Sequence, residues 1–243
     1  MTYPKTIQTL IISDLHLKEE ATGITQLFEK FIHQIAIQSQ ELIILGDFFE
    51  FWIGDDAMSD FQKSIAQQLA LLAKTGTQIF IMPGNRDLLL GKKFCQEAHA
   101  QLLPEIIKKK YLGKQIIFCH GDQLCTGDTA YQNYRKQVHK PWVKKLFLSL
   151  PVFIRRLIAQ KIRKNSKENF KKYPVMVDVE PKTVLDFLIK NKAEILIHGH
   201  THQKIYETLN QNNFTRIVNS DWGINHGSFI EINSEGIFLK DFV

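Results

Sequence analysis

Seven residues of the types that bind metal ions are distributed over five short segments of this 243-residue chain. They are Asp14, His16, Asp47, Asn85, His120, His200 and His202. Mixed carboxylate, amide and imidazole ligands suit Mn, Fe, Co or Zn, whereas a structural zinc site would use thiolates and a calcium site would use oxygen atoms alone. The residue types therefore predict a centre for divalent transition-metal ions, in which the two oxygens of Asp47 can bridge two cations.

Two of the segments contain a pair of ligand-type residues separated by one position. Side chains at positions i and i+2 point to the same side of an extended segment. Asp14 with His16, and His200 with His202, are therefore expected to hold a metal cluster from two sides. Two cations that share a ligand form the kind of centre that hydrolyses phosphate esters.

Each of the five segments follows or closes a short apolar run that is typical of a buried strand. The runs are TLIIS before Asp14, LIILG before Asp47, IFIMPG before Asn85, IIFC before His120 and EILIHG before His200. Loops at strand ends in open α/β sheets gather functional groups into one crevice. One such junction would be weak evidence, but five of them favour a metal centre over ordinary turns.

The segments DLH, GDFFE, GNRD, HGD and GHTH resemble, in this order, the five motifs of the calcineurin-like metallophosphoesterases. The resemblance spans roughly residues 10 to 225 and implies an α/β fold, a four-layer α/β/β/α sandwich of two mixed sheets. An alternation of strand and helix patterns up to residue 120 agrees with this fold class. The late segments FTRIVNS, GSFIEI and GIFLKDF are expected to be further, antiparallel strands.

A closer resemblance is to the UDP-2,3-diacylglucosamine hydrolase family, whose members act in bacterial lipid A synthesis. It is carried by FFEFWIGDD (48–56), GNRDLLLG (84–91), HGDQLCTGD (120–128) and MVDVEP (176–181). The resemblance implies two divalent ions, with Mn²⁺ favoured, and Asp47 as the bridge between them. One ion would be held by Asp14, His16, Asp47 and His202, and the other by Asp47, Asn85, His120 and His200.

The same resemblance implies contacts to the substrate from several residues. They are Asn85, Arg86, Asp128, Ser166, Asn169, Lys172 and His200. Asp47, Asn85, Arg86 and His200 are expected to act in catalysis. Many members of the wider family carry His where this chain has Arg86, and arginine does not give up its proton at neutral pH. Its planar fork can hold two phosphate oxygens, so Arg86 is expected to stabilise phosphate charge.

The reaction that the resemblance implies is attack of water at the α-phosphorus of UDP-2,3-diacylglucosamine. The products would be UMP and 2,3-diacylglucosamine 1-phosphate. One alternative is another phosphodiesterase of the same superfamily, acting on a nucleotide or a different UDP conjugate, which would keep every metal ligand. A non-enzymatic membrane-binding scaffold is a further alternative, but it would be expected to lack ligands, and none is missing.

A basic and apolar block lies between the fourth and fifth motifs. Residues 135–172 contain thirteen Lys or Arg and one acid, Glu168, although the whole chain has a net charge of only +6. Apolar residues recur there at spacings of three and four, and Pro141 and Pro151 are well placed to begin helices. Two or three short helices are therefore expected within residues 129–175, as a lid-like insertion over the metal crevice.

Three interpretations of this basic and apolar block can be compared. A basic amphipathic surface can bind anionic lipid headgroups, at about 1 kcal/mol per Lys or Arg, and its apolar residues can hold acyl chains. An ordinary helical hairpin with solvated lysines is the plainer alternative. Nucleic acid is disfavoured, because aliphatic residues outnumber the aromatic residues on which bases stack. No protein partner is implied.

Composition is that of one domain over residues 1–243, since no linker or repeat divides the chain. The N-terminal segment is expected to form a first strand and not a signal peptide. The longest apolar stretch, Leu146–Ile154, is interrupted and shorter than the ~20 residues of a transmembrane helix. Three cysteines without CxxC spacing suit a reducing compartment. The expected location is cytoplasmic, peripheral on the cytoplasmic face of the inner membrane.

Asp87, Asp122 and His198 lie next to motif residues and could be mistaken for further metal ligands. We expect them instead to orient loop backbones or the ligand histidines, because metal ligands are commonly held by such neighbours.

Overall fold

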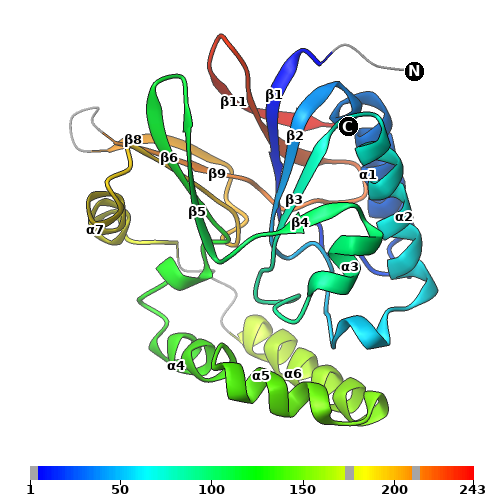
Figure 1. The fold of residues 1–243 in the computed structure, drawn as a ribbon. Coiled ribbons are helices and arrows are strands. Elements are labelled where there is room, and N and C mark those ends of the chain that lie inside the picture. Colours follow the sequence, from blue (N-terminus) through cyan, green and yellow to red (C-terminus); the bar gives the residue numbers. More distant parts are fainter. Residues whose placement is uncertain (1–4, 173–177, 210–213) are drawn as a thin grey trace.

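Two β-sheets pack face to face in the computed structural model, and helices cover the outer face of each sheet (Figure 1). The structure describes residues 5–172, 178–209 and 214–243, with the backbone alone for residues 165–172. The predicted four-layer α/β/β/α sandwich of two mixed sheets is confirmed.

The first sheet has the strand order β11-β10-β1-β2-β3-β4. Its strands are β1 (Ile7–Ile12), β2 (Ser39–Leu45), β3 (Gln78–Met82), β4 (Ala100–Leu102), β10 (Gly227–Ile232) and β11 (Ile237–Phe242). The strands β1 to β4 are parallel, whereas β10 is antiparallel to both β1 and β11. The outer helices are α1 (Thr22–Gln34), α2 (Asp60–Lys74) and α3 (Lys92–Glu97), and short 3-10 helices span Ala36–Gln38 and Asp55–Ala57.

The second sheet has the strand order β5-β6-β7-β9-β8. Its elements are β5 (Ile106–Tyr111), β6 (Lys114–Cys119), the 3-10 helix Asp122–Leu124, β7 (Ile195–His198), β8 (Ile205–Leu209) and β9 (Phe214–Val218), with α7 (Pro181–Asn191) outside. The expectation of antiparallel late strands is correct for β10 and β11, and it holds for β9 on one side only. That strand is antiparallel to β8 but parallel to β7, between which it lies.

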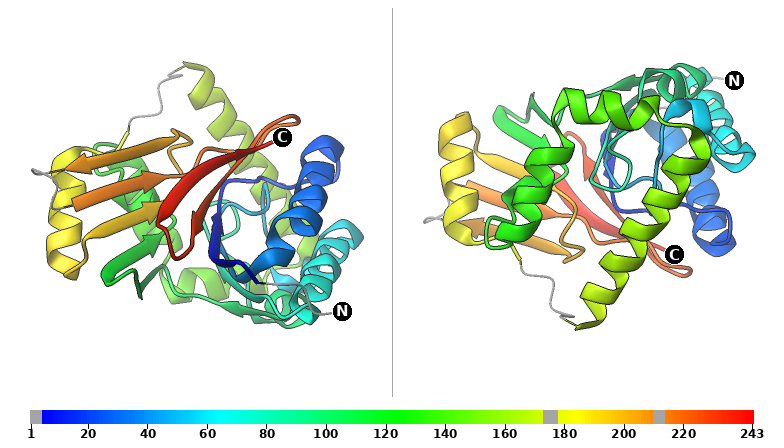
Figure 2. Two further views of the ribbon diagram at one scale, coloured as in Figure 1. Left: turned by 90° about the horizontal axis from the view of Figure 1, so that it is seen from above. Right: turned by 90° about the horizontal axis from the view of Figure 1, so that it is seen from below.

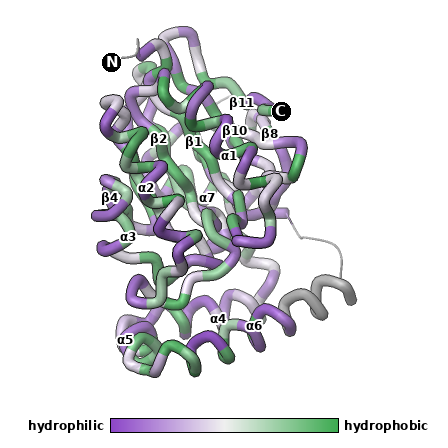
Figure 3. The backbone as a smooth tube through the Cα atoms, turned by 90° about the vertical axis from the view of Figure 1, so that its right-hand side faces the viewer, coloured by the Kyte–Doolittle hydropathy of each residue, from purple (hydrophilic) through white to green (hydrophobic). Residues whose placement is uncertain are grey.

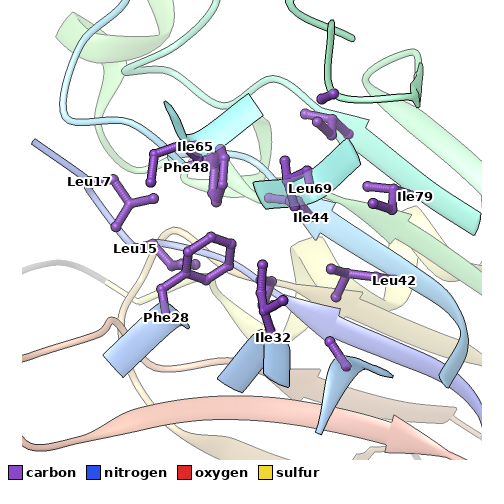
Figure 4. Packing of buried hydrophobic residues seen from close by; sticks show 14 of the residues in the cluster. Leu15, Leu17, Phe28, Ile32, Leu42, Ile44, Phe48, Ile65, Leu69 and Ile79 are labelled. Carbon is purple, nitrogen blue, oxygen red and sulfur yellow. The ribbon is translucent and has the colours of Figure 1, made fainter. Parts of the chain in front are cut away.

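The core forms on both faces of the first sheet because side chains alternate along each strand. Leu42 and Ile44 of β2 face the outer helices, where they pack with residues such as Phe28 and Leu69 (Figure 4). Ile43, between them, faces the second sheet and belongs to the apolar layer between the two sheets. The rigid strands produced by this packing fix the positions of the loops that follow them.

Three helices follow the second sheet's β6 and lie at one end of the molecule, across the ends of both sheets (Figures 1 and 2). They are α4 (Thr129–Val138), α5 (Pro141–Ser149) and α6 (Val152–Lys172). The last of them has 21 residues and is longer than the short helices that the sequence led us to expect. None of the helices in the described part of the chain combines the length and the apolar character needed to cross a membrane.

Arg155 fastens α6 to the body of the protein. Its guanidinium is almost completely buried, donates to the carbonyl oxygen of Ile53 at 2.5 Å and to that of Leu150 at 2.9 Å, and pairs with both carboxylate oxygens of Asp56. Hydrogen bonds that involve a charged group are stronger than neutral ones. The loop after β2 is therefore the attachment point of this helix.

An Arg155→Ala variant is expected to lose about 2 kcal/mol of unfolding free energy, because several charge-assisted hydrogen bonds disappear together. Asp56 is 60% exposed and would be rehydrated, which keeps the loss below that of a fully buried ion pair. Urea denaturation measures the effect, with the exposed neighbour Arg156 changed to Ala as the matched control. Equal stabilities of the two variants would show that Arg155 does not anchor the helix.

Candidate metal centre

The seven ligand-type residues all lie in loops that follow strands of the two sheets. Asp14 and His16 follow β1, and Asp47 follows β2. Asn85, His120 and the pair His200 and His202 follow β3, β6 and β7, respectively. Backbone hydrogen bonds join neighbouring loops: the amide of Asp14 donates to Gly46 and that of Gly199 donates to the carbonyl of His120. The loops thus converge on one place from both sheets.

The described residues form two clusters of candidate ligands. Asp14, His16 and His202 make up one, and Asp47, His120 and His200 make up the other. In the first cluster the Nε2 atoms of His16 and His202 face each other at 3.4 Å, and Nε2 of His202 lies 3.6 Å from Asp14 Oδ1.

Asp47 lies between the two clusters. Its Oδ1 is 3.5 Å from Nε2 of His120, whereas its Oδ2 is 4.0 Å from Nε2 of His16. Oδ1 of Asn85 is 2.9 Å from the same nitrogen of His120, which places the amide in the second cluster as well. The structure thus brings together all the residues for which the sequence predicted metal binding.

Five of these residues have a left-handed backbone conformation. The φ angles are 57° for Asp14, 49° for His16, 49° for Asp47, 68° for His200 and 57° for His202. The assumption of extended i, i+2 segments is therefore wrong, and the side chains converge through tight loops instead. Residues other than glycine rarely adopt this conformation, which costs of the order of 1–2 kcal/mol each and persists where function requires it.

Neighbouring groups fix the ring orientation of two of the histidines. Nδ1 of His120 lies 2.8 Å from the carbonyl oxygen of Leu45, so this nitrogen carries a proton and Nε2 faces the cluster. Nδ1 of His202 lies 3.6 Å from a carboxylate oxygen of Asp221. With a cation bound, both rings would offer an unprotonated Nε2 as the ligand atom.

Burial and the charges of neighbouring residues shift the pKa values of residues in the two clusters. Burial and the neighbouring carboxylates of Asp87 and Asp14 raise the pKa of Asp47 to about 7. Burial opposes protonation of His120, but the carboxylates of Asp47 and Asp14 outweigh it and raise the pKa to about 9. Burial lowers the pKa of His200 to about 3. Such a group of displaced pKa values is typical of functional sites, and bound cations would favour ionised carboxylates and neutral imidazoles.

Asp87 and His198 support the loops, as expected. The carboxylate of Asp87 accepts hydrogen bonds from the amides of Gly84, Phe48 and Phe49 at 2.6, 2.8 and 3.2 Å. Both ring nitrogens of His198 are engaged, one with the carbonyl of Gly199 at 2.8 Å and the other with Nε of Arg216 at 3.0 Å.

Asp122 connects the metal centre to α4, a contact that the sequence did not indicate. Its Oδ2 accepts from the hydroxyl of Tyr131 at 2.8 Å and from Nε of Arg135 at 2.7 Å. Tyr131 in turn stacks on His200, with ring centroids 6.1 Å apart and an interplanar angle of 25°. The sequence offered one signal for Tyr131, which is its place in the first turn of the helix that begins after Asp128.

The structure describes the side chains of some predicted substrate contacts but not of others. Nε of Arg86 is 4.0 Å from Asp47 and has no hydrogen-bond partner among the described residues, so its guanidinium is available to a substrate. Asp128 is exposed and its carboxylate accepts from the amide of Tyr131 at 2.8 Å, at the start of α4. The other three contacts, Ser166, Asn169 and Lys172, fall on α6, but their side chains lie outside the described part of the chain.

Comparison with known proteins gives one family and a consistent set of relatives. The family model described as calcineurin-like phosphoesterase matches residues 7–204. A UDP-2,3-diacylglucosamine hydrolase of Histophilus somni strain 129Pt is 42% identical, with 94% of this chain and 97% of that protein covered. Proteins of the same name from Haemophilus influenzae strain KW20 and Photorhabdus laumondii are 40% and 41% identical, over 95% and 96% of this chain and 98% of each relative. A solved archaeal phosphodiesterase covers 97% of this chain and 98% of its own at 14% identity, but its TM-score of 0.47 is too low to add to the comparison.

Proposed function

The chain belongs to the calcineurin-like phosphoesterase family, and we propose that it hydrolyses the pyrophosphate of UDP-2,3-diacylglucosamine in lipid A biosynthesis. The relatives that share about 40% of its residues over nearly its full length carry that name. The structural observation that supports the proposal most is the pair of His/Asp clusters joined by Asp47. These clusters lie beside the basic, apolar insertion, whose Tyr131 stacks on His200.

The residues of the two clusters fit a pair of divalent cations. Two imidazole nitrogens that face each other at 3.4 Å beside a buried carboxylate form a place for a cation in the first cluster. The first ion would be held by Asp14, His16, Asp47 and His202, and the second by Asp47, Asn85, His120 and His200. When bound, two such ions lower the pKa of a water molecule and neutralise charge on a phosphoryl group. We propose Mn²⁺ for both, since mixed oxygen and nitrogen ligands suit this ion.

The remaining residues of the site would bind and orient the substrate. Arg86 would offer a planar fork of donors to the pyrophosphate, and its distance of 4.0 Å from Asp47 supports a contact with the reacting phosphate. Asn85 and His200 would lie against the same phosphate. Asp128, Ser166, Asn169 and Lys172 are proposed to contact the substrate from the insertion. Attack of water at the α-phosphorus then yields UMP and 2,3-diacylglucosamine 1-phosphate.

The insertion, residues 129–175, is proposed to act as a lid-like element that receives the lipid part of the substrate. Figure 3 shows hydrophobic stretches on α5, at the periphery of the molecule. Trp142 and Leu146 on α5, and Phe153 and Leu157 on α6, are all more than half exposed, among many basic residues. Such a surface suits both acyl chains and an anionic membrane. We propose a peripheral location on the cytoplasmic face of the inner membrane.

Vesicle binding tests this membrane role. Changing Trp142 and Phe153 together to Ser is expected to reduce partition onto vesicles that contain phosphatidylglycerol at least about tenfold, because two large apolar side chains no longer leave water. Ile189→Ser is the matched control, since Ile189 is 59% exposed but lies on α7, outside the insertion. Partition that is the same in all three proteins would contradict the proposed surface.

Substrate selection tests the proposed function. The purified protein with Mn²⁺ is expected to release UMP from UDP-2,3-diacylglucosamine at least 10²-fold faster than from UDP-N-acetylglucosamine, since the acyl chains contribute binding energy that the simple sugar lacks. Mass spectrometry identifies both products. Cleavage of a simple phosphodiester without turnover of the lipid substrate would instead support another phosphodiesterase activity for the same centre.

A further inference from the structure

Glu50 lies at the junction between the metal centre and the inserted helix α6. It follows Asp47 by three residues, and its amide donates to the carbonyl of Leu17 at 3.1 Å, which fixes the backbone. The residue is only 9% exposed. Its two carboxylate oxygens have different partners: Oε2 lies 3.5 Å from Nδ1 of His16, and Oε1 pairs with the guanidinium of Arg163. A buried carboxylate thus contacts a candidate metal ligand and the insertion at once.

The carboxylate of Glu50 lies behind the ring of His16, on the side away from the first cluster. Nδ1 of this ring is buried and has no hydrogen bond among the described residues, and the carboxylate of Glu50 is its charged neighbour at 3.5 Å; Nε2 of the ring faces His202 in the first cluster. Two of the other three candidate ligand histidines show the same arrangement, because Nδ1 of His120 and of His202 also has an oxygen neighbour. A carboxylate behind a ligand histidine fixes its tautomer and increases its basicity. Glu50 occupies that position for His16.

The other end of the contact is held by α6. Arg163 is 22% exposed and lies eight residues after Arg155, which pairs with Asp56. Both arginines therefore reach the loop that follows β2, the same loop that carries Asp47. Among the described residues, Arg163 has no hydrogen bond or ion pair with a candidate metal ligand, and its direct contact at the centre is with Glu50.

We propose that Glu50 is a positioning residue that transmits the placement of α6 to the metal centre. Arg163 fixes the carboxylate of Glu50, and the carboxylate fixes the ring of His16. The inference rests on the proposed metal centre. Its consequence is that a residue of the substrate-binding insertion sets the affinity for the ion in the cluster of Asp14, His16 and His202, before any substrate is present.

Titration of the metal-free full-length protein with Mn²⁺, followed by electron paramagnetic resonance of the free ion, tests this inference. Glu50→Gln keeps the shape of the side chain and is expected to weaken binding of one of the two ions by about 10- to 100-fold. Arg163→Gln is expected to weaken the same ion about 3- to 10-fold, the size typical of an indirect coupling. The double variant is expected to bind no more weakly than Glu50→Gln alone, because Arg163 acts through Glu50.

Arg156→Gln is the matched control, since it removes an exposed arginine from the same helix and is expected to leave Mn²⁺ affinity within about twofold of wild type. Two tightly bound ions in both Glu50→Gln and Arg163→Gln would overturn the inference. Additive losses in the double variant would also overturn it, because Arg163 would then act independently of Glu50. If Glu50→Gln fails to fold, the Mn²⁺ affinity of Arg163→Gln alone tests the inference, because Arg163 is partly exposed and its replacement should be tolerated. A wild-type protein that binds no Mn²⁺ would overturn the metal centre itself.

Discussion

An Asp47→Asn variant is expected to lose at least about a thousandfold in kcat/KM toward UDP-2,3-diacylglucosamine, equivalent to about 4 kcal/mol of transition-state stabilisation. The two carboxylate oxygens of Asp47 face different clusters, with His120 on one side and His16 on the other. An asparagine has one carbonyl oxygen and no charge, so it can serve only one cluster. The variant should therefore bind fewer Mn²⁺ ions as well as turn over more slowly.

Asp60→Asn is the matched control for this prediction. Asp60 is the first residue of α2, its carboxylate is fully exposed, and its ion pair with Lys63 lies on the surface. Activity within about twofold of wild type is expected, since such exposed pairs contribute little. Unfolding by urea should show a folded Asp47→Asn protein. An Asp47→Asn enzyme that keeps more than a tenth of wild-type kcat/KM would contradict a shared carboxylate.

Arg86→Ala is expected to lower kcat by about 10²- to 10³-fold, because a fixed donor to the phosphoryl group is removed. The guanidinium lies 4.0 Å from Asp47 with its Nε unpaired among the described residues, so it has capacity for a substrate oxygen. Arg86→Lys should recover only part of this loss, since an ammonium cannot form the two parallel bonds of a guanidinium.

Steady-state kinetics of both Arg86 variants separate charge stabilisation from simple binding. A fall in kcat with little change in KM is expected if the contact strengthens in the transition state. Lys74→Ala removes an exposed cation at the end of α2 and serves as the control for total charge. Full turnover by Arg86→Ala would remove Arg86 from the catalytic residues.

Local sequence patterns were sufficient to predict the strands that precede the ligand loops. The run LIILG before Asp47 is a buried parallel strand, and the ligand residue follows at its carboxyl end. The backbone conformation of Asp47 was not predicted, because a left-handed residue in a non-glycine position is imposed by the surrounding loops. Side-chain direction at such a position cannot be taken from strand geometry.

Contacts between segments that lie far apart in the sequence could not be predicted from the sequence pattern. Glu50 looks like any acid in an aromatic-rich loop, and its importance depends on Arg163, more than a hundred residues later. The placement of β9 beside β7 likewise depends on the hairpin with β8, a strand that the sequence pattern did not indicate. The Glu50–Arg163 contact and the pairing of β9 depend on tertiary packing, whereas the strands before the ligand loops could be predicted from their apolar runs.

The most direct measurement is hydrolysis of UDP-2,3-diacylglucosamine by the Mn²⁺-loaded protein in water enriched in ¹⁸O, followed by mass spectrometry of both products. Attack at the α-phosphorus predicts one ¹⁸O atom in UMP and none in 2,3-diacylglucosamine 1-phosphate, with no release of either by Asp47→Asn above about a thousandth of the wild-type rate. Label in the sugar phosphate, or equal release by the Asp47→Asn protein, would contradict the proposed reaction at this centre.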